Sequence, residues 1–192
     1  MRSTPLYIGK TLRLTAINAE KDAPAAAVWT YQPEVAERFR DGPAVPMRPL
    51  EVRRIFEEWV KEAEDSGRNF VFAFRPCGDE DLLGFLRVAH VQWVHGAGFI
   101  SMVLGSPAVW ETYAAEALEM ALNYAFEELN LFRVTLAVGE DEIAARSLLV
   151  EANFTLEVRQ RQALYRGGKY LDRMLFGMLR PEWQVYHTME VA

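Results

Sequence analysis

The clearest helix pattern in the chain lies between two strand patterns, and this arrangement limits the possible folds most. Residues 112–129 place eight apolar side chains on one helical face: Ala114, Ala117, Leu118, Ala121, Leu122, Ala125, Phe126 and Leu129. Apolar strand patterns precede the helix at 99–104 and follow it at 132–138. A strand–helix–strand unit in one sheet needs a right-handed crossover, which makes its two strands parallel. We therefore predict a parallel pair between 99–104 and 132–138.

The other patterns predict antiparallel neighbours. Strands are expected at 11–17, 70–74, 82–88, 154–164 and 170–179, and helices at 19–31, 50–65 and 141–152. Residues 40–49 contain three prolines and are expected to form a loop. Turn residues at 76–81 and 166–169 join their flanking strands into hairpins. The predicted fold class is a mixed α/β (α+β) fold, with a mostly antiparallel central sheet and helices on both faces.

Charge and composition exclude several classes of protein. The chain has 192 residues, a net charge of −6 and one cysteine, which predicts one domain without an internal disulfide. Proteins that bind nucleic acid as their main partner usually carry a basic surface, so no nucleic-acid partner is expected. His90, His95 and His187 lack the spacing of metal ligands. No apolar run is long enough to cross a membrane, so a cytoplasmic location without membrane contact is expected.

Several segments resemble a known family. They are 9–14 (Gly-Lys-Thr-Leu-Arg-Leu), Trp29 with 33–35, 116–118 with 124–134, 165–172 (Tyr-Arg-Gly-Gly-Lys-Tyr-Leu-Asp) and 179–183 (Leu-Arg-Pro-Glu-Trp). In this order and at these separations they resemble the GNAT superfamily of acyltransferases, and within it the RimJ/RimL-type protein N-acetyltransferases. The resemblance extends over about residues 9–183. It implies one GNAT-like domain at 1–183 followed by a C-terminal tail at 184–192.

The resemblance implies acetyl-CoA as co-substrate and a primary amine, in a protein N-terminus or a small molecule, as acceptor. The residues expected at the cofactor are Met102, Val103, Leu104, Trp110, Glu111, Thr112, Tyr113, Ala114, Ala115 and Glu142. The acceptor groove is expected at Trp29, Tyr31, Arg87 and Trp93. The catalytic residues stay unassigned, with His90 and Ser101 as candidates. The apolar tail suggests a homodimer.

The phosphate loop and the proton-donor position depart from the family. The family's loop is rich in glycine, whereas this chain has Trp110-Glu111-Thr112-Tyr113. Glu111 and Thr112 are expected either to cap the following helix or to precede amides at 113–115 that still bind phosphate. Three further positions differ from the family. The family has an asparagine at the start of the second helix, a tyrosine as proton donor and a glutamate in the strand before the loop. This chain has Glu142, Leu149 and Phe99 at these positions.

Two functions therefore stay open. One is an active N-acetyltransferase, in which Tyr113, Tyr165 or Tyr170 could replace the missing proton donor. The other is a catalytically degenerate member of the family that acts as a binding or oligomeric module.

Overall fold

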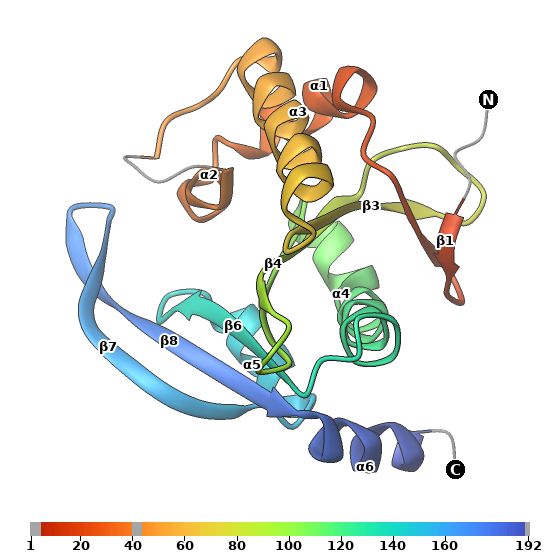
Figure 1. Ribbon diagram of the computed structural model, residues 1–192. Coiled ribbons are helices and arrows are strands. Elements are labelled where there is room, and N and C mark those ends of the chain that lie inside the picture. Colours follow the sequence, from red (N-terminus) through yellow and green to blue (C-terminus); the bar gives the residue numbers. More distant parts are fainter. Residues whose placement is uncertain (1–4, 40–43, 191–192) are drawn as a thin grey trace. The chain divides into compact units, whose positions relative to one another are not determined.

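The computed structural model describes residues 5–39 and 44–190, which belong to two compact units (Figure 1). Unit 1 contains residues 1–90 and 101–121, and unit 2 contains residues 91–100 and 122–192. Strands β4 (Gly84–Gln92) and β5 (Ala97–Leu104) and helix α4 (Pro107–Asn123) each pass from one unit to the other.

Unit 1 is built on antiparallel strands in the order β1-β2-β3-β4. Strands β2 (Leu12–Thr15), β3 (Phe70–Pro76) and β4 confirm the predicted strand patterns. The short strand β1 (Pro5–Ile8) was not predicted. Its Leu6 and Ile8 side chains are exposed, so this edge strand shows no buried face that a periodicity could reveal.

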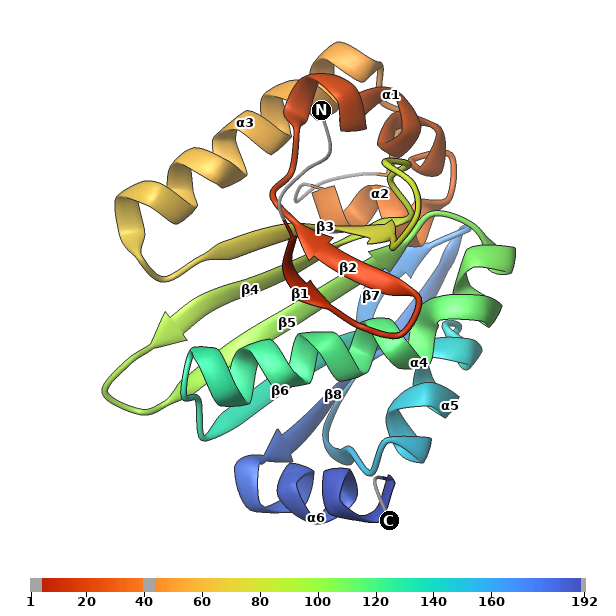
Figure 2. The same ribbon diagram turned by 90° about the vertical axis from the view of Figure 1, so that its right-hand side faces the viewer.

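Two groups of helices cover the strands of unit 1. Figure 2 shows α1 (Ala19–Trp29) and α3 (Pro49–Ser66) on one side of β2, β3 and β4, with α4 on the other. Gly67 ends α3 with a left-handed φ of 55°, as the predicted helix end requires. Rings of Phe39, Phe56, Trp59 and Phe85 form the centre of the core beneath α3, with centroids 5.2–6.0 Å apart.

Helix α2 (Pro33–Phe39) lies where no helix was predicted. It is only seven residues long, too short to be stable by itself. Its Val35, Ala36 and Phe39 side chains are buried, so tertiary packing stabilises it. In the expected loop that follows, residues 40–43 lie outside the described residues, and 44–48 have no regular structure.

Unit 2 holds the strands β5, β6 (Arg133–Gly139), β8 (Lys169–Leu179) and β7 (Thr155–Arg166), in that order. Strand β5 pairs in parallel with β6, from Ala97 opposite Arg133 to Ile100 opposite Leu136. This confirms the predicted parallel pair. The pairs β6–β8 and β7–β8 are antiparallel. The strand pairing is therefore mixed and mostly antiparallel, and the predicted fold class is confirmed.

The helical segments of unit 2 are η1 (Tyr124–Glu128, a π-helical turn after α4), α5 (Ile143–Glu151) and α6 (Arg180–Glu190). Asn153 follows α5 with a left-handed φ of 60°, a conformation that commonly ends a helix. Helix α6 was not predicted. It includes residues 184–190 of the expected tail, whereas 191–192 lie outside the described residues. Trp183 anchors its first turn by stacking on Phe126, with ring centroids 5.2 Å apart.

Candidate functional site around the start of helix α4

Helix α4 begins at Pro107, five residues before the predicted start. The Ser106 hydroxyl accepts a hydrogen bond from the Val109 N–H at 3.3 Å, and the Ser106 carbonyl accepts one from the Trp110 N–H at 2.9 Å. Ser106 is therefore the N-cap, and Pro107 occupies the first helical position, where its missing N–H costs nothing. The Ser-Pro pair is a helix-start signal that sequence reasoning missed.

The expectation that Glu111 and Thr112 cap the helix is wrong. Both lie more than one turn inside α4, and the Thr112 hydroxyl donates to the Ala108 carbonyl at 2.8 Å. The amides at 113–115, where phosphate contacts are predicted, lie inside α4, and amides inside a helix donate to carbonyls four residues earlier. An anion at this end of α4 would meet the first turn, at residues 107–109.

Replacing Ser106 by alanine should lower the free energy of unfolding by about 1 kcal/mol, because the Val109 N–H loses its acceptor. Glu111→Gln is the matched control: Glu111 is exposed inside the helix, so less than about 0.5 kcal/mol is expected. Urea denaturation of the two variants measures both values. A larger loss in Glu111→Gln than in Ser106→Ala would show that Ser106 does not cap α4.

The end of β5 packs mainly into the core of unit 1. Val103 and Leu104 are buried, whereas Ser101 and Met102 are partly exposed. Trp29, expected in the acceptor groove, is 9% exposed and belongs to the same buried cluster as Val103. A Cβ atom at Gly105 would lie 2.1 Å from the Trp29 ring. The structure thus brings Trp29 against the β5–α4 junction, as a core residue.

The other acceptor and catalytic candidates of unit 1 have different surroundings. The Arg87 guanidinium lies 4.0 Å above the Trp59 ring and 3.8 Å from the Glu62 carboxylate. Burial lowers the pKa of Arg87, and Glu62 opposes this shift. Tyr31 is 73% exposed. His90 is exposed and has a left-handed φ of 54°. Its backbone N–H donates to the side-chain oxygen of Asn69 at 3.1 Å.

Two candidates, Trp93 and Glu142, lie in unit 2. Trp93 is half exposed. Glu142 precedes α5 and accepts a hydrogen bond from the Gly139 N–H at 3.1 Å, while its carboxylate lies 3.3 Å from the Arg166 guanidinium. Arg166 therefore balances the charge that replaces the family's asparagine. Leu149, which stands at the position of the family's tyrosine, is 2% exposed and cannot donate a proton.

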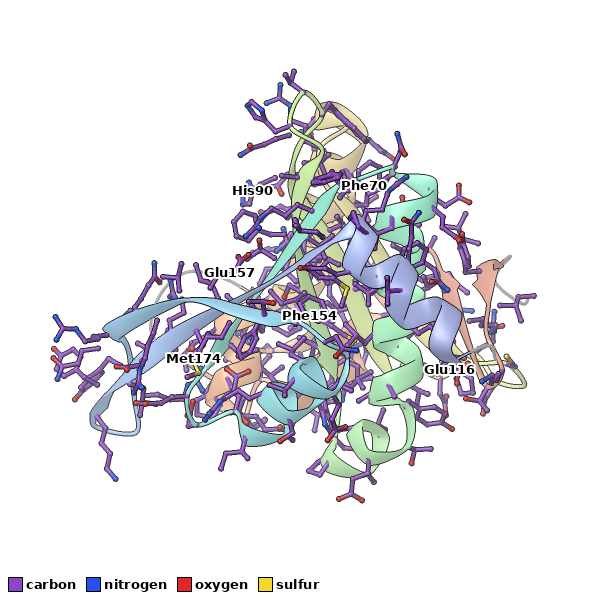
Figure 3. All side chains as sticks on the ribbon, turned by 90° about the horizontal axis from the view of Figure 1, so that it is seen from below. Phe70, His90, Glu116, Phe154, Glu157 and Met174 are labelled. Carbon is purple, nitrogen blue, oxygen red and sulfur yellow. The ribbon has the colours of Figure 1, made fainter. Side chains whose placement is uncertain are left out.

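Glu116 of α4 joins two of the segments that carry the resemblance. Its carboxylate accepts hydrogen bonds from the Thr11 N–H at 2.8 Å, the Leu12 N–H at 3.1 Å and the Thr11 hydroxyl. Figure 3 shows its side chain beside the β1–β2 hairpin. Burial by itself raises the pKa of Glu116, but these hydrogen bonds outweigh it and hold the pKa below the ordinary value. The role of Glu116 is thus to hold β2 on α4.

The carboxylate of Glu116 should stabilise the fold in a pH-dependent way. Because its pKa is lowered in the folded state, its contribution is complete above the ordinary glutamate pKa and is lost as the pH falls through the folded-state value. Glu116→Gln should cost about 1–2 kcal/mol at pH 7, less than for a fully buried carboxylate because the site is partly exposed. Urea denaturation between pH 3 and pH 7 measures this; a difference that does not shrink at low pH would contradict it.

Among the described residues, no group of histidine, cysteine, aspartate and glutamate side chains could hold a metal ion, and no helix is long and apolar enough to cross a membrane. The acetyltransferase (GNAT) domain family matches residues 11–155.

Individual relatives are distant in sequence. YdaF of Bacillus subtilis, whose name describes a ribosomal N-acetyltransferase, is 24% identical over 106 residues, which are 55% of this chain and 58% of YdaF. RimL, a ribosomal L7/L12 α-N-protein acetyltransferase solved with coenzyme A, has a TM-score of 0.76 at 18% identity, covering 92% of this chain and 98% of RimL. SpeG, the spermidine/spermine N-acetyltransferase of Vibrio cholerae, has a TM-score of 0.74 at 16% identity, covering 93% and 99%.

Proposed function

The chain belongs to the GNAT acetyltransferase family, and on that premise we propose that it transfers an acetyl group from acetyl-CoA to a primary amine. The observation that carries the proposal is the family match over residues 11–155, which includes the whole β5–α4–β6 unit. The acceptor is a protein N-terminus or a small amine. Relatives named for ribosomal proteins and for spermidine support either class.

The N-terminus of α4 is the part of unit 1 that suits an anionic cofactor. The helix has 17 residues, and its positive dipole end and first-turn amides attract phosphate. Residues 105–115 contain no lysine or arginine, Pro107 has no N–H, and the Val109 N–H donates to Ser106. The Ala108 N–H and the positive end of the helix dipole would therefore supply the attraction. We place the cofactor along Met102 and Trp110, both partly exposed, and residues 106–109, rather than at 113–115.

Acetyl-CoA would supply an activated acetyl thioester. The chain's task is then to hold the neutral amine near the thioester carbonyl and to accept the proton that the amine loses on attack. His90 remains the candidate that could accept this proton, and Ser101 could only relay it toward the CoA thiolate that leaves when the C–S bond breaks; both residues are at least partly exposed. The homodimer and the cytoplasmic location also remain predictions.

The competing function is a GNAT-fold module that binds no acetyl-CoA. The observation in its favour is the helical start of α4, where the family has a glycine-rich loop. Without that loop, fewer backbone amides are free to approach a pyrophosphate.

A thermal-shift titration with acetyl-CoA distinguishes the two functions. Binding to the folded state alone raises the midpoint temperature with ligand concentration, by several degrees at about a hundred times the Kd. Ser106→Asp is the sharpest control, because aspartate is an equally good N-cap but adds a negative charge where the pyrophosphate would lie. We expect the variant to fold with unchanged stability and to bind acetyl-CoA about tenfold more weakly.

No shift at millimolar acetyl-CoA would reject the transferase and favour the binding module. Equal shifts in the wild-type protein and in Ser106→Asp would reject the placement of the phosphates at α4. Release of the CoA thiol, followed separately with an N-terminal peptide and with spermidine, then identifies the acceptor class.

A further inference from the structure

Arg87 of β4 is a partly buried arginine whose guanidinium donates no hydrogen bond to any other residue that the structure describes. Its side chain is 22% exposed. The Glu62 carboxylate of α3 lies 3.8 Å from one of its terminal nitrogens, which is longer than a hydrogen bond. Its other close contact is the Trp59 ring, whose centre lies 4.0 Å from the guanidinium carbon. The hydrogen-bond donors of Arg87 are therefore not used by the described fold.

Two other arginines of unit 1 show what a structural arginine has in this sheet. Arg13 and Arg75 are 5% and 3% exposed. Arg13 donates to the Glu80 carboxylate and to two backbone carbonyls. Arg75 donates to the Asp22 carboxylate, to a hydroxyl group and to a backbone carbonyl. Buried donors are nearly always satisfied in this way, so Arg87 has the surroundings of a residue that waits for a ligand.

The chemistry of the Arg87 site suits a carboxylate. Burial lowers the pKa of Arg87, because the charged guanidinium loses water that no hydrogen bond replaces. Glu62 offsets this only in part, since its side chain is 57% exposed and its attraction is screened. The Trp59 ring holds the guanidinium from one face and leaves its N–H edge available. A carboxylate can take two parallel hydrogen bonds from such an edge.

Arg87 also lies beside the end of β5. The turn at 93–96 makes β4 and β5 antiparallel neighbours. The Gly105 N–H donates to the Leu83 carbonyl at 2.9 Å, so residues 105 and 83 lie opposite each other. Counting along the two strands from this bond brings Ser101 opposite Arg87.

The same count places Arg87 and Ser101 on the face of the strands that α3 covers. Phe85 and Val103, each two residues closer to the Gly105 bond, belong to one buried cluster beneath α3 (Figure 2). Side chains two residues apart on a strand project to the same face. Ser101 directly precedes Met102, where we place the cofactor. A group bound at Arg87 would thus lie one strand away from the proposed path of the acetyl thioester.

We propose that Arg87 is a specificity-determining residue that binds a carboxylate of the acceptor. This inference rests on the proposed acetyl transfer and narrows its acceptor to an amine that also carries a carboxylate. The carboxylate belongs either to an amino-acid-like small molecule or to an acidic side chain next to a protein N-terminus. Spermidine, a polycation without a carboxylate, would be a poor acceptor, because Arg87 would repel it.

Steady-state acetyl transfer to two matched pairs of acceptors tests the inference. One pair is β-alanine and its amide. The other is a four-residue peptide amide with glutamate at its second position and the same peptide with glutamine there. We expect kcat/KM to be at least about tenfold higher for the carboxylate member of one pair, with the difference mainly in KM. The pair that shows the preference identifies the source of the carboxylate.

Three variants assign the preference to Arg87. Arg87→Met keeps an apolar side chain on Trp59 and should reduce the preference to about onefold, while kcat for the uncharged acceptor changes less than about twofold. Arg87→Lys keeps the charge without the fork of donors and should retain a preference of at least about threefold. Arg54→Met removes an exposed arginine of α3 and is the matched control, with an unchanged preference. Urea denaturation shows whether each variant folds.

Several outcomes would overturn the inference. Equal kcat/KM within both pairs in the wild-type protein would do so even if Arg87→Met fails to fold, and it would leave the proposed function intact. An equal fall for both members of a pair in Arg87→Met would assign Arg87 a structural role that ties β4 to α3. Faster transfer to spermidine than to the carboxylate acceptors would reverse the expected specificity. Absence of transfer to every acceptor, without a thermal shift by acetyl-CoA, would instead reject the proposed function, and this inference with it.

Discussion

Asp22→Ala should lower the free energy of unfolding by about 3–5 kcal/mol, the largest expected loss for a charged residue of unit 1. Asp22 and Arg75 are 2% and 3% exposed, and their carboxylate and guanidinium meet at 2.7 and 2.9 Å. The substitution leaves the Arg75 charge buried without its carboxylate. It also removes the acceptor of the Asn18 N–H at the start of α1. Chemical denaturation measures the loss.

A double variant separates the pair from its surroundings. Asp22→Leu combined with Arg75→Met replaces both charges by apolar side chains and should cost less than Asp22→Ala alone, because no buried charge remains. Arg75 also donates to the Thr15 hydroxyl at 3.0 Å and to the Glu80 carbonyl at 2.7 Å, so some loss remains. If the double variant is less stable than the single one, the pair stabilises the fold by itself.

Trp29→Ala should also cost about 3–5 kcal/mol, because it opens a cavity in the core of unit 1. Trp29 packs against Gly105 and belongs to the buried cluster that includes Val103. An acceptor-groove residue would behave differently: its loss would weaken substrate binding with little change in stability. Denaturation and acetyl-CoA titration of the same variant distinguish the two roles.

Tyr31→Ala is the matched control for Trp29→Ala. Tyr31 lies two residues further along the chain but is 73% exposed, so its loss should change stability by less than about 0.5 kcal/mol. If Trp29→Ala were as stable as Tyr31→Ala, Trp29 would belong to the groove after all. A lower activity of Tyr31→Ala at unchanged stability would support its predicted place at the acceptor.

The segments that carry the family resemblance prove to be contact points within each unit. In unit 1, the backbone N–H groups of Thr11 and Leu12 donate hydrogen bonds to the carboxylate of Glu116 on α4. In unit 2, Arg180 donates to the carbonyls of Leu131 and Phe126, next to the Trp183–Phe126 stack. Such pairs explain why the resemblance holds in separate stretches: each stretch supplies one side of a contact. The sequence order alone could not show which stretches meet.

The start of α4 was predicted less well than the fold. The residues expected at the cofactor lie on either side of the true start at Pro107, and the helix boundary was placed five residues too late. This error moved Glu111 and Thr112 to the start of the helix and made them the expected cap. A boundary depends on one cap and one proline, whereas a helix interior repeats its signal over several turns.

Apolar periodicity in the sequence was enough to determine the β5–α4–β6 unit, the parallel pair and the mostly antiparallel pairing, because each buries many side chains with a regular spacing. Only the tertiary structure decided the rest. The short elements β1, α2 and α6 depend on their neighbours, and Trp29 is a core residue only because Gly105 leaves room for its ring. The ion pairs of Arg133 with Glu157 and of Arg159 with Asp172 likewise emerge only in the structure, because they join residues far apart in the sequence. A single residue's role depends on contacts from elsewhere in the chain, which no local pattern records.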